Sequence, residues 1–117
     1  MFKNYLTYNF ALSFERSCRA IMKNRAEIPV FTADRLNQSL NQMVFGLTQS
    51  LQTTDRKAEL RFVCSSLINL RDCKDILIEA KLFDGETKQV YTVLCGRLER
   101  ICSIKALDAG GQLQLFA

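Results

Sequence analysis

Ten lysine and arginine side chains are the residues whose types and spacing most clearly suggest a chemical role. Arg16, Arg19 and Lys23 recur at intervals of three and four residues, which places them on one face of a helix. Cations on a helical surface can neutralise phosphates and release counterions, a way of binding nucleic acid that needs no base-reading motif. Seven further candidates for this role follow: Arg56, Lys57, Arg61, Arg71, Lys74, Arg97 and Arg100.

An alternative interpretation is that these cations are solvated helix faces that pair locally, as Arg71 could with Asp75. The carboxylates Asp72, Asp75 and Glu79 share one outer face. Carboxylates act as acid and base when a cleft separates their pKa values, and no such cleft is indicated. The glycine-turned loop of an EF-hand is also missing. We therefore expect a solvated face without a metal or cofactor.

Histidine is absent, and the cysteines lack the spacing of metal ligands. The absence of histidine excludes His-based acid–base catalysis, Ser-His-Asp and Cys-His nucleophilic sites, and His-containing zinc sites. The number of cysteines is odd and no pair is spaced as Cys-x-x-Cys, so neither a disulfide framework nor a zinc ribbon is indicated. We expect buried thiols in a reducing compartment, and no enzymatic activity or small-molecule substrate. The five are Cys18, Cys64, Cys73, Cys95 and Cys102.

The size and charge of the chain fit one ordinary domain. It has 117 residues, of which 48% are hydrophobic and 24% charged, as in globular rather than disordered proteins. The net charge of +4 permits a nucleic-acid or acidic-protein partner. The first ten residues resemble neither a signal nor a transit peptide, and no run approaches the roughly 20 apolar residues of a membrane span. We expect a cytoplasmic protein that does not enter membranes.

Hydrophobic periodicity predicts four helices joined by short breaks. Thr32 is the expected N-cap of the second helix, and Thr53-Thr54-Asp55 supplies N-cap chemistry for the third. Helices of about 20 residues with short connections predict an all-α, antiparallel up-down-up-down four-helix bundle. The expected ranges are 3–24, 33–52, 56–82 and 86–107, with a tail over 108–117 that is either a frayed end or a hook onto a neighbour.

Two of these helices carry a second apolar face. The first helix has its inner face at Leu6, Phe10, Phe14, Cys18 and Ile21, and the third has its main stripe between Leu60 and Ile78. A helix that is apolar on two sides is buried on two sides, which in so small a protein favours burial against another subunit. The second faces, expected to form an oligomer interface, contain Tyr5, Tyr8, Leu12, Phe62, Cys73 and Ile76.

Two residues interrupt these patterns. Lys74 falls inside the main stripe of the third helix, where it either extends its charged end out of the core or lines a polar channel or meets an acidic partner. Phe45 interrupts the polar, glutamine-rich face of the second helix. A single exposed aromatic is usually incidental, and contact with a partner is the alternative.

Four segments carry a distinctive order of residues: residues 9–16 (NFALSFER), Arg35-Leu36, residues 66–77 (SLINLRDCKDIL) and residues 91–101 (YTVLCGRLERI). Together they resemble a bacterial four-helix bundle family, first named for proteins encoded in intervening sequences of the large-subunit ribosomal RNA gene. The family includes the accessory variability determinant of diversity-generating retroelements. The resemblance covers about residues 8–105, and its motifs are mostly helix-packing positions.

The resemblance implies an up-down-up-down bundle that assembles into a ring-like homopentamer. In the retroelement branch it implies a basic pentamer that binds a reverse transcriptase and nucleic acid and supports mutagenic cDNA synthesis, with no enzymatic activity of its own. Where many members carry Ser-Ile-Pro-x-Asn-Ile-Ala-Glu-Gly, residues 39–47 here read SLNQMVFGL, which indicates a divergent branch.

These patterns favour a non-enzymatic, oligomeric helical adaptor that presents cations to RNA, DNA or a nucleic-acid enzyme such as a reverse transcriptase. The alternative hypothesis is a structural or protein-interaction module whose cations only increase solubility. Its contact surface would be Phe45 and the glutamine-rich face around it.

Overall fold

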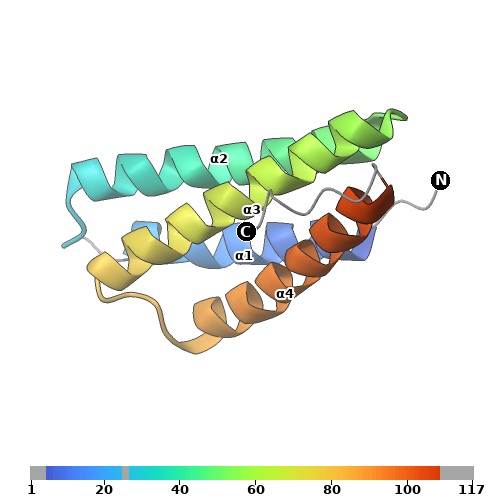
Figure 1. Cartoon of the computed structure of the whole chain (residues 1–117). Helices are drawn as coiled ribbons and strands as arrows, with labels where there is room; N and C mark the ends of the chain where they lie inside the picture. Colours follow the sequence, from blue (N-terminus) through green and yellow to red (C-terminus); the bar gives the residue numbers. More distant parts are fainter. Residues whose placement is uncertain (1–4, 25–26, 109–117) are drawn as a thin grey trace.

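The part of the chain that the computed structural model describes comprises residues 5–24 and 27–108, with side chains up to Ser103. It contains no β-strand, so the prediction of an all-α fold is confirmed for these residues. The predicted helix start at residue 3 and the tail after residue 108 lie outside the described residues. The four helices, shown in Figure 1, are α1 (Tyr5–Asn24), α2 (Val30–Gln52), α3 (Arg56–Glu79) and α4 (Gly85–Asp108).

Each helix packs against two neighbours, and the four close into an antiparallel bundle (Figure 1). Neighbouring helices run in opposite directions, because the residue numbers of contacting residues rise along one helix and fall along the next. This is the predicted up-down-up-down order. The contacts are Thr7–Arg97 and Ser17–Thr87 between α1 and α4, Arg35–Glu79 and Met43–Ser66 between α2 and α3, and Cys64–Cys102 and Arg71–Glu99 between α3 and α4.

The core is a column of side chains from all four helices, and its α1 face differs from the predicted one. Leu6 is 56% exposed, although it was expected inside. Successive steps of four residues rotate by about 40° around a helix, so a face spaced 4-4-4 cannot stay buried along its whole length. The buried face of α1 follows a tighter period and consists of Thr7, Ala11, Phe14 and Cys18.

The helix ends show which capping predictions were right. The Asp55 side chain accepts a hydrogen bond from the Lys57 backbone N–H at 3.1 Å and caps α3 as expected. Thr32 is not a cap, because α2 begins at Val30 directly after Pro29. The third helix stops at Glu79 rather than residue 82, since Lys81 adopts a left-handed conformation (φ 60°) that ends it in a Schellman turn.

The second apolar face of α3 is buried within the chain itself, which corrects part of the predicted oligomer interface. Cys73 and Ile76 are 0% and 3% exposed and belong to the core. The reason is that α3 packs against both α2 and α4, so a single chain covers two sides of this helix. Of the other predicted interface residues, Tyr5 is exposed, whereas Tyr8, Leu12 and Phe62 are half-buried.

Candidate nucleic-acid interface

Four of the ten cations predicted from the sequence have charged ends that contact a neighbouring helix and form a first group, and the other six form a second group. The side chains of the first group are held by other residues of the bundle: Arg19, Arg71, Lys74 and Arg97. Those of the second group are exposed to solvent: Arg16, Lys23, Arg56, Lys57, Arg61 and Arg100. We take the second group as the candidate contact surface for an outside partner, and one of its members, Arg16, also donates to the Ser13 hydroxyl at 3.2 Å.

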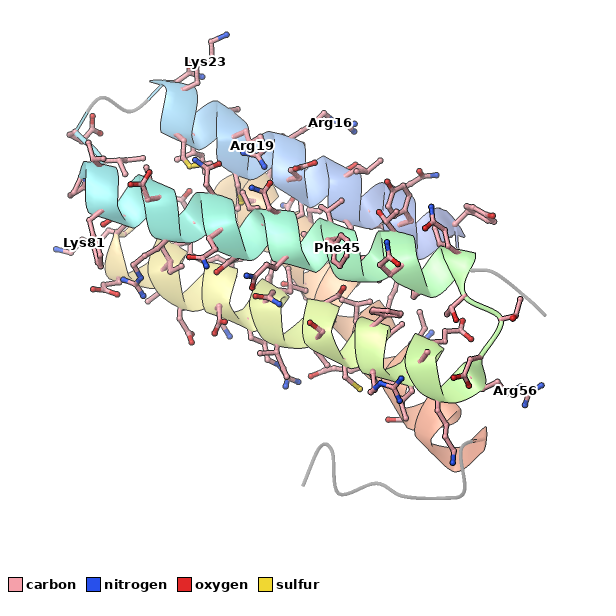
Figure 2. The ribbon with its side chains drawn as sticks, turned by 90° about the horizontal axis from the view of Figure 1, so that it is seen from above. Arg16, Arg19, Lys23, Phe45, Arg56 and Lys81 are labelled. Carbon is pink, nitrogen blue, oxygen red and sulfur yellow. The ribbon has the colours of Figure 1, made fainter. Side chains whose placement is uncertain are left out.

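Arg19 joins α1 to α2. Its guanidinium forms an ion pair with Glu15, one turn earlier on α1, at 3.0 Å between Nη2 and Oε2. It also donates hydrogen bonds to the side-chain amide oxygens of Asn37 and Asn41 on α2, the latter at 2.8 Å. The Arg19 guanidinium thus donates four hydrogen bonds to residues of the bundle. Figure 2 shows Arg19 between α1 and α2. We therefore remove Arg19 from the candidate interface.

Arg97 joins α4 to α1. Its Nε donates to the Thr7 hydroxyl at 2.9 Å, and its guanidinium carbon lies 5.6 Å from the centre of the Phe10 ring. Both contacts are half-buried, and a cation over an aromatic face is stabilised by the ring quadrupole. Arg97 is therefore a packing residue of the α1–α4 seam.

Arg71 joins α3 to α4 at the surface. Its Nη2 lies 2.7 Å from Oε2 of Glu99, and this hydrogen-bonded carboxylate raises the pKa of the guanidinium. The partner is thus on the neighbouring helix rather than at Asp75. Both side chains are about half exposed, so solvent screens the pair, and it contributes about 0–1 kcal/mol to stability.

Lys74 faces α4 from inside the main stripe of α3. Its Nζ lies 5.5 Å from the centre of the Tyr91 ring and 6.0 Å from that of Phe83. Two aromatic faces take the place of a carboxylate partner, which explains how a lysine is accommodated beside the core. Lys74 is consequently a structural cation rather than a phosphate ligand.

Several exposed cations gather at the end of the bundle where α3 begins and α4 finishes. Lys57 and Arg61 are one helical turn apart on the exposed side of α3. One turn further, the sulfur of Cys64 lies 3.8 Å from that of Cys102, which brings the last turns of α4 alongside. Arg100, two residues before Cys102, therefore lies on the same half of the bundle, nearer its middle. We name this surface the cationic end and define it as Arg56, Lys57, Arg61 and Arg100.

The remaining exposed cations of the predicted set lie elsewhere. Lys23 and Arg56 are at opposite ends of the bundle, and Arg16 points outward from α1 between them (Figure 2). The single basic face expected for Arg16, Arg19 and Lys23 is thus interrupted, because Arg19 turns toward α2. The cations form two separate surfaces rather than one cluster.

The local electrostatics of the cationic end favour an anion. Arg56 and Lys57 occupy the first turn of α3, where the helix dipole is positive and each cation costs about 0.3–1 kcal/mol. Asp55 caps one backbone N–H, and Glu59 is buried, so the exposed charge here is mainly positive. A phosphate placed against this surface would relieve the repulsion between the helix dipole and these side chains.

Some exposed residues of interest were not singled out from the sequence. Val30 and Phe31, at the start of α2, are 76% and 72% exposed, and Lys81 is exposed beside the turn that ends α3. Val30 and Phe31 directly follow Pro29, and this spacing was the signal that could have placed them at a helix start.

Within the described residues, no group of three or more potential ligands converges as a metal site, and no helix has the length and apolar character needed to cross a bilayer.

Comparison of the chain with protein-family models, with curated proteins and with solved structures finds no match in any of the three. The resemblance to the intervening-sequence family therefore stays a prediction that depends on the residue patterns alone.

Proposed function

We propose that this protein is a non-enzymatic, cytoplasmic helical-bundle protein that binds RNA or DNA through the phosphate backbone, with the cationic end as the contact surface. The observation that carries the proposal is that Lys57, Arg61 and Arg100 are all exposed on the same half of the bundle and, among the described residues, engage no carboxylate. Four other predicted cations contact residues of a neighbouring helix, so this surface is not a by-product of uniform basicity.

Binding of this kind needs no pocket. Lysine and arginine side chains reach phosphate oxygens from a convex surface and gain free energy mainly by releasing counterions. A net charge of +4 gives a modest attraction for one chain. We propose, as the family resemblance implies, that the chain forms a homopentamer, whose charge of five times +4, about +20, would attract polyanions strongly.

The resemblance also suggests a reverse transcriptase as protein partner. A basic ring that holds template RNA near such an enzyme would act as an adaptor and would need no catalytic group of its own. The enzyme would be recognised by the assembled ring together with its bound nucleic acid.

The binding surface is tested by removing equal charge from the two ends of the bundle. The first variant combines Lys57→Ser, Arg61→Ser and Arg100→Ser. The matched control combines Lys23→Ser, Lys81→Asn and Lys88→Ser, where asparagine tolerates the left-handed backbone. Fluorescence anisotropy with a short labelled single-stranded RNA should show at least about a tenfold loss of affinity for the first variant and a smaller loss for the control. Equal losses would contradict the assignment of the surface.

A second candidate function, protein recognition without nucleic acid, is favoured by one observation. Phe45 is 60% exposed on the outer side of α2, surrounded by polar side chains (Figure 2). An aromatic ring in such a position is a suitable anchor for a partner. Nucleic-acid binding that is kept in the Phe45→Ser variant and lost in the triple variant of Lys57, Arg61 and Arg100 would favour nucleic-acid binding as the function.

A further inference from the structure

Two thiols on different helices are in contact at the α3–α4 seam. The sulfur atoms of Cys64 and Cys102 are 3.8 Å apart, although the residues are separated by 38 positions in the chain. Cys64 is half-buried, so one side of the pair is open to small reagents, and Cys102 is 0% exposed behind it. A reactive thiol with access to solvent and a second thiol within reach is the arrangement of a dithiol that can be oxidised.

The two thiols are not equivalent. The hydrogen bond from Cys102 lowers the pKa of Cys64, and the same hydrogen bond, with burial, raises the pKa of Cys102. The accessible sulfur is therefore the one that more readily becomes a thiolate, the nucleophilic form. The buried sulfur keeps its proton and lies in place to react with whatever forms on the first.

The other cysteines provide an internal contrast. Cys18 and Cys73 are 0% exposed, and burial raises the pKa of both thiols. Neither property favours oxidation. Cys95 is half-buried on α4 and serves as a control for accessibility without this sulfur contact.

We propose that Cys64 and Cys102 form a reversible, peroxide-sensitive disulfide that fastens the start of α3 to the end of α4. In the first step the Cys64 thiolate attacks one oxygen of a hydroperoxide. The O–O bond breaks, hydroxide or alkoxide leaves, and Cys64 becomes a sulfenic acid. In the second step the Cys102 sulfur attacks Cys64, the S–O bond breaks, and the Cys102 proton leaves with the hydroxyl as water. Overall, two thiols are oxidised by two electrons and one peroxide is reduced.

Formation of the bond requires the two sulfur atoms to move together. A disulfide has a sulfur–sulfur distance of about 2.0 Å, so the two sulfurs must approach by about 1.8 Å. Cys64 lies on a partly exposed helix face, where a change of side-chain rotamer is less hindered than in the core. The proposal does not depend on nucleic-acid binding and holds or fails separately from the proposed function.

The test uses the full-length, reduced protein treated with equimolar hydrogen peroxide. Remaining thiols are then alkylated under denaturing conditions and counted by intact mass, and the linkage is mapped by non-reducing peptide mass spectrometry. We expect two of the five thiols to be lost, a peptide that joins Cys64 to Cys102, and full recovery on treatment with a phosphine reductant. Oxidised protein should melt about 10 °C higher than reduced protein.

Variants assign the roles of the two sulfurs. In the Cys64→Ser variant, peroxide should form no intramolecular disulfide. In the Cys102→Ala variant, the oxidation of Cys64 should stop at a sulfenic acid, which dimedone traps. The Cys95→Ser variant should form the same disulfide as the wild type. A disulfide between other cysteines or between chains would overturn the proposal, as would retention of all five thiols. If a variant does not fold, the peptide map of the wild-type protein decides the question by itself.

Discussion

Gly46 of α2 lies directly against Ser66 of α3. A Cβ atom at position 46 would collide with the Ser66 hydroxyl oxygen and would come within 2.8 Å of the Phe62 carbonyl oxygen. Ser66 is fully buried, and its hydroxyl donates to the Met43 carbonyl at 2.7 Å. The two helices therefore approach closely through a small residue on one side and a satisfied hydroxyl on the other.

Gly46→Ala should destabilise the bundle by about 2 kcal/mol, because the obstructing carbonyl belongs to the backbone and cannot rotate away. Gly96→Ala is the matched control, since a Cβ there would meet nothing within 4 Å and alanine favours the helix by about 1 kcal/mol. Urea unfolding should give shifts of opposite sign. Two shifts of the same sign would contradict the close α2–α3 approach.

Arg97→Ala should also destabilise the protein, by about 1–2 kcal/mol, because it removes the hydrogen bond to Thr7 and the contact over Phe10. The neighbouring Arg100 is exposed, so Arg100→Ala should change the free energy of unfolding by less than about 0.5 kcal/mol. The urea midpoints of the two variants measure this difference. Equal effects would mean that Arg97 does not hold α4 to α1.

Stability should fall in alkaline solution. Burial raises the pKa of the Cys18 thiol from 9.0 to about 12, so unfolding releases a proton once the pH exceeds 9. A raised pKa gives a contribution that is complete below the unfolded-state value and is lost as the pH rises toward the folded-state value. From pH 8 to pH 10 the loss should be about 1 kcal/mol for this group. Cys18→Ala should reduce that loss, and an unchanged pH dependence would contradict the effect of burial.

The proposed ring predicts a particle of five chains. Sedimentation at micromolar concentration should give a mass five times that of the 13.4 kDa chain. Tyr5, which was expected at the interface, is 60% exposed, and its neighbour Leu6, which was expected inside, is 56% exposed. Tyr5→Ser with Leu6→Ser should therefore release monomers. Phe45→Ser, on α2, should not. A wild-type protein that sediments as a monomer would contradict the proposed homopentamer.

Much of the fold was predictable because helix periodicity is a local property. The stripe Leu36, Leu40, Met43 and Leu47 is buried as expected, and Asp55 caps α3. Periodicity identifies an apolar face but not the element that covers it. For this reason Cys73 and Ile76 were assigned to a partner subunit, whereas they are buried in the core of the same chain.

The candidate site was less predictable for a related reason. Arg19, Arg71 and Arg97 each have a partner on another helix, and the register between helices decides which residues meet. A local pattern cannot distinguish these cations from Lys57 or Arg61, which remain exposed. The sequence thus gives the set of candidates, and the packing of the bundle selects among them.

The central claim is that the cationic end binds phosphates, and the salt dependence of RNA affinity tests it most directly. The logarithm of the association constant should fall linearly with the logarithm of salt concentration, by about 0.7 per phosphate neutralised on a single strand. Replacing Lys57, Arg61 and Arg100 with serine should make that slope shallower by about 2, while the control at the opposite end changes it less. A flat salt response in the wild-type protein, or an unchanged slope in the variant, would contradict the claim.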